Sequence, residues 1–244
     1  MSKLNSLAQF KITKHLYTMA LSKQQLKIRN FWKKRPKLIT REIRDIIHGY
    51  IMSDGYLNEQ GTLQLRQCLD QSKFVDWLYE KLKTIRTETP IHTSKNPDKR
   101  TEAVTYSRGF STRALLKGFH SMWYKPNPNP GKPRFIKKLP NSIKAIMSPT
   151  VLTLWFAGDG TKIKESRGAK IEVTSFTVEE RLKLQSLLDE KLQLPVEVNK
   201  AGTADSGTPQ WTINFNAPSY TRFRELITQI DLIENVFPNK LHRK

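Results

Sequence analysis

Two aspartate–glycine pairs are the residues of this sequence whose placement could support chemistry. Asp54-Gly55 ends the apolar run in "YIMSDGYL", and Asp159-Gly160 ends the one in "LWFAGDGT". The carbonyl groups at the end of a helix already carry partial negative charge, so an acid there is disfavoured. One such acid is consistent with a simple turn, because Asp and Gly are common turn residues. Two of them, after similar apolar runs, indicate a site where positive charge compensates both carboxylates.

The chain repeats around these two acids, which lie 105 positions apart. Other residues match at the same offset and in the same order, among them Pro90 with Pro195 and Phe110 with Phe215. A repeat of this length predicts two similar structural halves. The resulting division of the chain is a basic N-terminal extension (1–40), a first half (41–124), a Pro- and Lys-rich linker (125–148) and a second half (149–244).

Each half is predicted to begin with an apolar helix, over 41–54 and 149–159. Gly55 and Gly160 suit the left-handed residue that closes a helix, and Ser148-Pro149 suits the start of the second one. Ser72 and Thr177 are the expected N-caps of a later helix in each half, and "TVEE" forms a capping box. The remaining predicted elements of this α+β chain are strands 62–68, 90–95, 103–109, 169–174, 195–200 and 209–215, and helices 72–86, 112–123, 177–192 and 217–230. The prolines of "KPNPNPGKP" predict a stiff, extended connector between the halves.

The predicted strands alternate apolar and polar residues, so one face of each sheet is polar. Gln, Arg, Lys, Thr and Asn are the side chains that pair with base edges in a major groove. A solvated sheet face would also be polar, so one strand alone decides nothing. The residues that we expect to contact DNA are Gln64, Arg66, Lys95, Lys138, Lys170, Glu172, Thr174, Lys200, Gln210, Thr212 and Asn214.

The overall charge favours a nucleic-acid partner. The chain has 244 residues with 42 Lys or Arg against 22 Asp or Glu, a formal net charge of +20 and an isoelectric point near 10.0. Such a balance is typical of proteins that bind nucleic acid. Cys68 is the only cysteine, which excludes a disulfide framework and a cysteine zinc site. The five histidines show no ligand spacing, His48 is expected to be a packed or surface residue, and no apolar run is long enough to cross a membrane.

The first 41 residues contain eleven Lys or Arg and no acid. An organellar transit peptide is basic, amphipathic and poor in acids in the same way. A basic extension that lies along phosphates would have the same composition. We favour the extension because "NFWKKRP" at 30–36 carries bulky aromatic residues suited to packing, but composition does not separate the two.

The two aspartate segments, "IIHGYIMSDG" and "VLTLWFAGDG", resemble the paired motifs of LAGLIDADG homing endonucleases. The likeness is to the single-chain subgroup of organellar introns and covers residues 40 to 244. "KKLPN" at 137–141 and "NKLH" at 239–242 resemble the basic elements that close each half in this subgroup. The chain departs from the pattern at Leu154, where a helix-packing glycine is expected, and at Met52 and Ala157, where an acid is common. The resemblance implies a pseudo-symmetric tandem repeat of an αββαββα fold, each half with a curved antiparallel DNA-binding sheet.

The same resemblance implies the chemistry. The two motif helices would pack side by side, so that Asp54 and Asp159 together bind a divalent cation, with Mg²⁺ favoured by hard oxygen ligands. Lys137 and Lys240 would stabilise the charged transition state or orient water, with Lys138 an alternative to Lys137, and Gln67 would position water. The implied reaction is metal-dependent hydrolysis of both strands of a long, asymmetric double-stranded DNA target, leaving 3′ overhangs.

Two other functions fit the same sequence. An RNA maturase that assists splicing of a group I intron would bind intron RNA with the basic surface and would not need both aspartates. A non-catalytic DNA-binding protein would not need either. The retention of both acids favours the nuclease. We expect a monomer in an organelle, a mitochondrion or a chloroplast, with no membrane partner.

Overall fold

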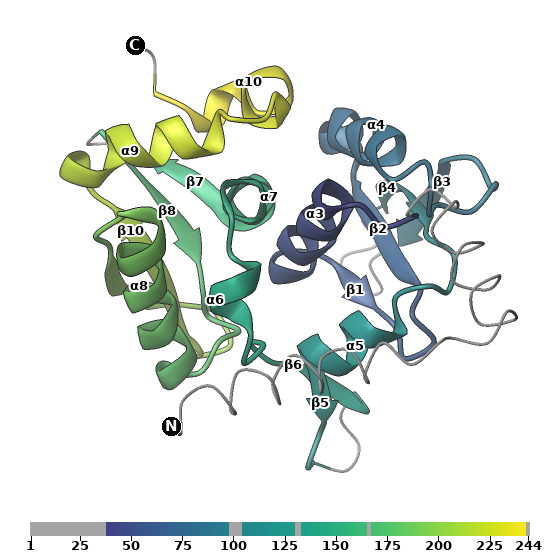
Figure 1. Cartoon of the computed structure of the whole chain (residues 1–244), viewed down its shortest axis with the longest axis horizontal. Helices are drawn as coiled ribbons and strands as arrows, with labels where there is room; N and C mark the ends of the chain where they lie inside the picture. Colours follow the sequence, from purple (N-terminus) through teal and green to yellow (C-terminus); the bar gives the residue numbers. More distant parts are fainter. Residues whose placement is uncertain (1–37, 98–103, 130–132, 165–166, 243–244) are drawn as a thin grey trace, which may run out of the picture. The chain divides into compact units, whose positions relative to one another are not determined.

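The computed structural model describes residues 38–97, 104–129, 133–164 and 167–242 (Figure 1). The chain divides into two units at residue 38, and the helices and strands described belong to the unit Ile39–Lys244. The predicted N-terminal extension therefore lies outside the described residues, apart from its last three.

Both halves share the order helix, two strands, helix, two strands, helix, as the repeat predicts, and differ in their additional short helices. The first half consists of α3 (Arg41–Met52), β1 (Tyr56–Leu57), β2 (Leu63–Cys68), the short 3₁₀ helix η1 (Leu69–Gln71), α4 (Ser72–Lys81), β3 (His92–Pro97), β4 (Val104–Ser111) and α5 (Lys117–Trp123). The second consists of α7 (Pro149–Asp159), β7 (Gly160–Ile163), β8 (Gly168–Glu172), α8 (Val178–Leu192), β9 (Glu197–Thr203), β10 (Pro209–Phe215), α9 (Ala217–Ile227), α10 (Leu232–Val236) and η2 (Pro238–Lys240). Between them lie β5 (Tyr124–Pro126), β6 (Phe135–Lys137) and α6 (Ile143–Ile146).

Each half has one four-stranded antiparallel sheet, and the two sheets share a strand order. That order is β1-β2-β4-β3 in the first half and β7-β8-β10-β9 in the second. The registers agree with the repeat as well. Lys95 pairs with Tyr106 as Lys200 pairs with Trp211, while Phe110 and Phe215 pair with β2 and β8 respectively. The structure thus confirms the duplication that the offset of 105 positions predicts.

The two motif helices form for reasons that the sequence makes visible. Thr40 caps α3 by accepting a hydrogen bond from the Ile43 amide at 3.2 Å, and Ser148 caps α7 by accepting one from Val151 at 3.3 Å. Pro149 occupies the first turn of α7, where its missing N–H costs nothing. Val151 to Ala157 are all buried, because α7 is enclosed on every side rather than amphipathic.

One hydrophobic core runs through both halves. It is built on α3 and α7, which pack against each other between the two sheets of this unit (Figure 1). Contacts between the halves extend beyond this pair: the rings of Phe74 and Phe237 meet edge to face at 5.2 Å, and Trp77 Nε1 donates to Asp231 Oδ1 at 3.0 Å. Because buried side chains of the two halves share this core, the motif helices are held in one relative position.

Some predicted elements differ from the observed ones. The bounds 149–159 and 209–215 are confirmed, but α3 ends at Met52, so Ser53 and Asp54 form a turn after the helix. Ser72 is not an N-cap: it is the first residue of α4, and its hydroxyl donates to the Leu69 carbonyl. Thr177 and Glu180 form the predicted capping box.

The linker is not the extended connector that its prolines predict. In its described part the chain makes the antiparallel hairpin β5–β6, followed by the helix α6. The strands of the hairpin pair Tyr124 with Lys137, and Lys137 Nζ contacts the end of α3 through the Ile51 carbonyl. Among the described residues, no helix is both long enough and apolar enough to span a bilayer.

Candidate active site at the ends of the motif helices

The two motif helices approach closely at small residues. A Cβ on Gly49 of α3 would lie 2.5 Å from the Leu154 Cβ of α7, and one on Gly158 would lie 2.5 Å from the Ser53 Cβ and 2.9 Å from Asp54 Oδ2. Real Cβ atoms do not come this close, so any larger residue would push the helices apart. Gly158 therefore brings the Asp54 carboxylate against the last turn of α7, next to Asp159.

The role of the glycine after each aspartate differs from the prediction. Gly160 has φ −93° and ψ 152°, which is extended, and Gly55 is absent from the positive-φ residues of the described chain. The left-handed helix ending predicted for both is therefore wrong. The residues are small because of crowding: a Cβ on Gly55 would lie 2.6 Å from the Tyr50 carbonyl oxygen, and one on Gly160 would lie 2.0 Å from the Phe156 ring.

Asp159 is the electrostatically strained member of the pair. Its pKa is raised from 3.8 to about 7, chiefly by burial and then by the charge of Asp54; Glu172 contributes in the same direction, while Lys137 and Lys240 act against the shift. The carboxylates of Asp54 and Asp159 thus interact directly enough to disfavour double ionisation. No hydrogen-bond donor to Asp159 is found among the described residues. Asp54 is the more exposed of the two and accepts a hydrogen bond from Gln67 Nε2 at 3.0 Å.

Two lysines occupy equivalent positions at the ends of the two motif helices. Lys137 Nζ donates to the carbonyl oxygens of Ile51 at 2.6 Å and Ser53 at 2.9 Å. Lys240 Nζ donates to Ala157 at 2.6 Å and, at longer distances, to both neighbouring carbonyls. An ammonium group at these positions satisfies helix-end carbonyls that lack an intrahelical partner.

Burial lowers the pKa of both lysines, and the two aspartates act in the opposite direction. For Lys240 the resulting pKa is about 8. Lys137 and the adjacent Lys138 lie in different surroundings, because Lys137 is the last paired residue of the hairpin and Lys138 follows it. Lys138 lines a different hollow, together with Lys117 and His120, and so does not extend toward the aspartates as Lys137 does.

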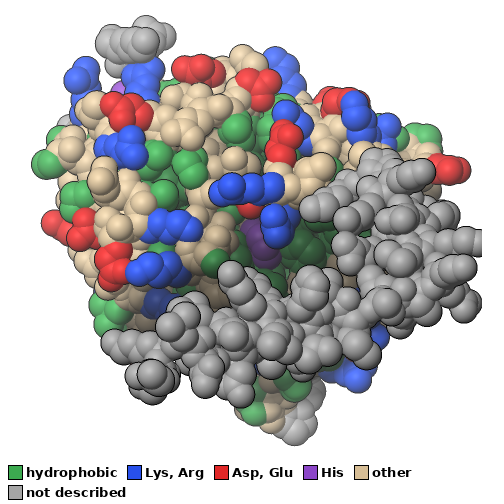
Figure 2. Space-filling model, in the orientation of Figure 1, with side chains coloured by type: hydrophobic (Ala, Val, Ile, Leu, Met, Phe, Trp, Pro, Cys, Tyr) green, Lys and Arg blue, Asp and Glu red, His purple; other side chains and the backbone are tan. Residues whose placement is uncertain are grey.

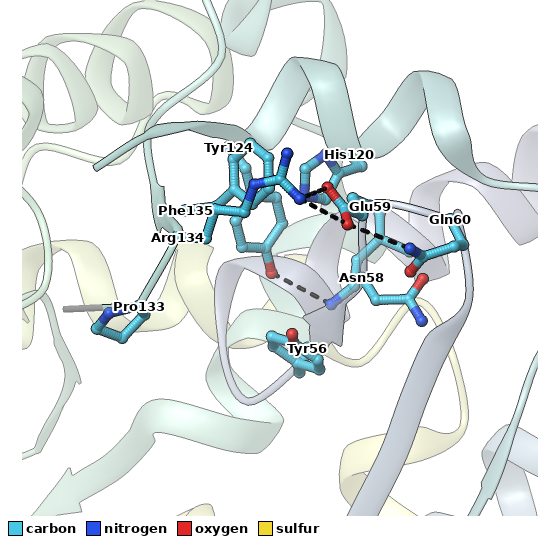
Figure 3. A pocket seen from close by; sticks show the side chains of 10 residues that line it. Tyr56, Asn58, Glu59, Gln60, His120, Tyr124, Pro133, Arg134 and Phe135 are labelled. Carbon is cyan, nitrogen blue, oxygen red and sulfur yellow. Dashed lines mark hydrogen bonds and ion pairs between the residues drawn. The ribbon is translucent and has the colours of Figure 1, made fainter. Parts of the chain in front are cut away.

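A hairpin brings Lys137 to α3, and it is anchored on the β1–β2 turn (Figure 3). The Leu57 amide donates to Tyr124 Oη at 3.2 Å, and Arg134 forms an ion pair with Glu59 at 2.9 Å. His120 stacks on the Tyr124 ring with centroids 4.8 Å apart and meets Phe135 edge to face at the same distance. These contacts line a cavity of about 200 Å³ and hold the strand that carries Lys137.

Gln67 lies where the strand alternation predicts, on the buried side of β2. Its Nε2 also approaches Tyr50 Oη at 3.4 Å, and Tyr50 Oη accepts from the Arg66 amide at 3.2 Å. The second half lacks this amide. Leu65 and Ala169 pair with the matching Phe110 and Phe215, so the position of Gln67, two residues further on, is taken by Ile171. The surroundings of Asp54 and Asp159 are therefore unequal.

The donor set fits a divalent cation. Two carboxylates come together in a partly buried site where their charges repel, and their oxygens are the ligands that Mg²⁺ and Ca²⁺ prefer. Within the described part of the chain, no cluster of three or more His, Cys, Asp or Glu side chains is arranged to hold a metal. Further ligands of an ion between Asp54 and Asp159 would thus come from water, a backbone carbonyl or a bound phosphate.

The polar face of the first sheet carries most of the residues expected there. Gln64 and Arg66 are exposed and alternate with buried Leu65 and Gln67. Lys95 is an exception, because its register opposite Tyr106 places it with Arg108, which pairs with Asp76 of α4 on the helix-covered side.

Sequence reasoning missed residues that the register adds to this face. Tyr56 is 56% exposed and pairs with Gln64, and the Asn96 amide donates to Ser107 Oγ at 2.9 Å. Tyr50 was missed as well, since a tyrosine inside an apolar helix shows no sign of its contact with Gln67. The match of Ser107 with Thr212 in the repeat could have pointed to β4.

In the second sheet, too, polar residues that alternate with buried ones share one face. Lys170 pairs with Asn214, and Glu172 pairs with Thr212, so these four share the polar face, and Gln210 has the same alternation. Lys200 pairs with Trp211 and so takes the helix-covered side, in parallel with Lys95.

Two of the hydroxyl groups expected on the polar face of the second sheet already form hydrogen bonds within the protein. Thr174 Oγ1 accepts from the Trp211 amide at 3.0 Å, and Thr212 Oγ1 donates to Asn214 Oδ1 at 2.9 Å. Thr174 thus joins the segment that follows β8 to β10.

His48 of the first motif is a packed residue, as predicted. Its Nδ1 accepts a hydrogen bond from Trp123 Nε1 at 2.9 Å, and only 3% of the residue is exposed. Burial, followed by the charge of Arg44, lowers its pKa to about 4. The ring is therefore neutral at physiological pH.

Comparison with known proteins gives one family. A family model described as the LAGLIDADG DNA endonuclease family matches residues 44–223. The solved structure of the homing endonuclease I-WcaI bound to its DNA recognition sequence has the same fold, with a TM-score of 0.68 over 94% of this chain and 98% of that one, at 15% identity.

Curated relatives match over shorter stretches. An uncharacterized protein of Methanocaldococcus jannaschii is 26% identical over 157 residues, and a cytochrome b mRNA maturase of Debaryomyces hansenii is 35% identical over 69. The matches cover 62% and 28% of this chain, but only 56% and 26% of those proteins. The chain thus spans about half of the first relative and a quarter of the second.

Proposed function

The chain belongs to the LAGLIDADG DNA endonuclease family, and on that premise we propose that it is a site-specific DNA endonuclease. It hydrolyses one phosphodiester bond in each strand of a long, asymmetric duplex and leaves 3′ overhangs. The observation that carries this proposal is the meeting of Asp54 and Asp159 at the ends of α3 and α7, each helix end holding a lysine.

The residues at the ends of the two motif helices have separate roles in the proposed reaction. Asp54 and Asp159 would hold a divalent cation, which lowers the pKa of a water molecule and offsets charge on the leaving oxygen. Lys137 and Lys240 keep an ammonium group beside each helix end, where it favours a phosphate that gains negative charge in the transition state. Gln67 fixes the orientation of the Asp54 carboxylate by its 3.0 Å hydrogen bond.

The two sheets supply recognition. Their polar faces differ, with Gln64 and Arg66 on the first and Lys170, Glu172 and Asn214 on the second, so the two half-sites need different bases. One chain then reads one whole target, and we propose a monomer. Gel filtration or light scattering of the DNA complex should give one protein chain per duplex, and two chains per duplex would contradict the proposal.

Selection of cleaved sequences from a randomised duplex pool with Mg²⁺ tests the activity. The wild type should enrich one family of sequences, and Asp54→Asn and Asp159→Asn should bind these duplexes without cutting them. Asp205→Asn, an exposed loop residue, is the matched control and should cut normally. If the two active-site variants cut at the wild-type rate, the aspartate pair is not catalytic.

A second candidate function is an RNA maturase, because the chain is 35% identical over 69 residues to a cytochrome b mRNA maturase. Splicing of a group I intron in the presence of Asp54→Asn and Asp159→Asn separates the two functions. Splicing that these variants still accelerate indicates a maturase role beside the nuclease. We also propose an organellar location, a mitochondrion or a chloroplast, which imaging of the tagged full-length protein would test.

A further inference from the structure

The hydroxyl group of Tyr50 is joined to the candidate active site through a glutamine. Tyr50 Oη accepts a hydrogen bond from the Arg66 amide at 3.2 Å and donates to the Arg66 carbonyl at 3.5 Å. It also accepts one from Gln67 Nε2 at 3.4 Å, and the same nitrogen donates to Asp54 Oδ2 at 3.0 Å. In the described part of the chain no hydrogen bond joins Tyr50 to an aspartate directly. Its hydroxyl can therefore act on the site only through Gln67.

The carboxylate and the hydroxyl together decide which way the Gln67 amide points. An ionised carboxylate can only accept hydrogen bonds, so the amide nitrogen rather than the amide oxygen faces Asp54. This nitrogen carries two protons, and Tyr50 Oη is the acceptor for the second one. The amide oxygen, Oε1, has no hydrogen-bond partner among the described residues and is not one of their buried unpartnered atoms, so it is open to solvent. A water molecule beside Asp54 can donate to it.

Burial makes the Tyr50 hydroxyl hard to replace. Figure 2 shows Lys, Arg, Asp and Glu side chains interspersed over one face of the protein, where water competes for every hydrogen bond. Tyr50 is fully buried, by contrast, and only 9% of Gln67 is exposed. Hydrogen bonds in such surroundings are stronger than in water, and losing one partner is unfavourable. Solvent is thus a poor substitute for the hydroxyl.

The second half has no counterpart of this arrangement. Trp155 is found 105 positions after Tyr50, and each of the two precedes its aspartate by four positions. An indole can donate but not accept, and Trp155 Nε1 is buried without a hydrogen-bond partner among the described residues. Ile171 takes the position of Gln67 and has no polar side-chain group. The hydroxyl and the amide are both missing from the second half, which fits a joint role in the first.

We propose that Tyr50 is a positioning residue for the first half of the active site. Its hydroxyl holds the second amide proton of Gln67, so that Oε1 accepts a hydrogen bond from the water molecule that attacks the scissile phosphate of one strand. Tyr50 itself contacts neither the water nor the phosphate. This inference rests on the proposed endonuclease function and deepens it, because it makes the cleavage of one strand depend on a hydroxyl that the other strand does not need.

The test compares Tyr50→Phe with Tyr220→Phe in the full-length protein. Tyr50→Phe removes a single oxygen atom, which is the acceptor of the Gln67 amide. Tyr220→Phe is the matched control: it removes the hydroxyl of another buried tyrosine, in the second half, whose Oη accepts from the His242 amide at 3.1 Å. Both variants lose an acceptor for a backbone amide, so the control accounts for a general loss of stability, which thermal unfolding would measure.

Single-turnover cleavage of a selected duplex, with each strand labelled separately and the protein saturating, gives one rate for each strand. Tyr50→Phe should slow one strand about 2- to 12-fold, the loss expected for one hydrogen bond, and this should be the strand that Gln67→Leu slows. Tyr220→Phe should keep the wild-type ratio of the two rates. The affinity of Tyr50→Phe for the duplex in EDTA should equal that of the wild type, so that the loss lies in the rate and not in binding.

The double variant Tyr50→Phe/Gln67→Leu separates a positioning role from an independent one. It should cut each strand as fast as Gln67→Leu alone, because the hydroxyl acts only through the amide. Equal slowing of both strands by Tyr50→Phe, or a further loss in the double variant, would overturn the inference.

A second readout needs neither a metal nor cleavage. Nuclear magnetic resonance of the metal-free protein identifies the side-chain amide protons of Gln67 by their absence from the spectrum of Gln67→Leu. In the wild type these protons should show a nuclear Overhauser effect to the Tyr50 ring. In Tyr50→Phe one of the two resonances should move upfield because its acceptor is lost, whereas both should stay in place in Tyr220→Phe.

The wild-type spectrum alone can refute the contact, so the test does not depend on the stability of Tyr50→Phe. Absence of the Overhauser effect in the wild type, or an unchanged amide pair in Tyr50→Phe, would overturn the inference. If the effect and the shift are found but the wild type cuts no duplex, the endonuclease proposal fails while the placing of the Gln67 amide by Tyr50 is supported.

Discussion

Replacing Asp159 by Asn is expected to make the metal-free protein more stable above neutral pH. Burial and the charge of Asp54 raise the pKa of Asp159 from 3.8 to about 7, so ionising this side chain in the folded state is unfavourable. Asn has nearly the same shape and no charge. The variant would thus lose its divalent-cation ligand and gain stability through the same change.

The size of the effect follows from proton linkage. A shift of about three pKa units at about 1.36 kcal/mol each amounts to about 4 kcal/mol. Because the folded-state pKa is the higher one, the stabilising proton is fully bound below pH 3.8 and is lost as the pH rises through about 7. The free energy of unfolding of the wild type should fall across this window relative to that of Asp159→Asn. A gain of about 4 kcal/mol corresponds to about 8–16 °C in melting temperature for a chain of this size.

Urea denaturation in EDTA, from about pH 4 to pH 7.5, measures this difference. Groups that titrate in both proteins cancel when the two curves are subtracted, so the difference reports Asp159. Asp205→Asn, in an exposed loop, is the control and should run parallel to the wild type. If the Asp159→Asn and wild-type curves are also parallel across the window, the carboxylate is not strained and the reasoning fails. Added Mg²⁺ should stabilise the wild type and not Asp159→Asn.

Three further substitutions probe the site. Gly158→Ala would place a methyl group 2.5 Å from Ser53 and should cost about 1–3 kcal/mol in thermal unfolding, whereas Gly118→Ala, whose Cβ meets nothing within 4 Å, should not. Gln67→Leu removes the hydrogen bond to Asp54 and should slow one strand, so that nicked plasmid accumulates; equal slowing of both strands would count against the asymmetry. Lys240→Met should reduce cleavage. Because the Lys240 pKa is about 8, cleavage by the wild type should decline above that pH as the ammonium group loses its proton. The residual activity of the variant should not show this decline.

The periodicity of the sequence was a good guide to the repeat and to local elements. Pro149, Ser148 and the Thr177 capping box act over one helical turn, so their effects can be read from neighbouring residues. The alternation in β2 likewise predicts which of its side chains are buried. The αββαββα order implied by the resemblance includes β1 and β7, but their bounds were not predicted. The β5–β6 hairpin was not anticipated, because such short strands are stabilised by their partners rather than by their own composition.

The glycines show where a correct observation led to a wrong reason. Gly55 and Gly160 do mark the ends of the two motif segments. The reason for a glycine there is crowding by Tyr50 and Phe156, which leaves no room for a side chain, and not a left-handed backbone conformation. The preference of glycine for turns is a property of that residue alone. Crowding depends on where atoms of residues several positions away lie, which the residue type does not show.

The sequence by itself determined that the chain is a basic, duplicated α+β protein of one family, with one aspartate after each apolar helix. Only the tertiary structure decided that Lys137 rather than Lys138 joins the aspartates, and that Lys95 and Lys200 leave the polar faces. Composition and periodicity depend on residues near one another in the chain. Packing between distant segments decides which lysine contacts a carbonyl group more than eighty positions away. The same packing decides how strongly two neighbouring carboxylates are buried.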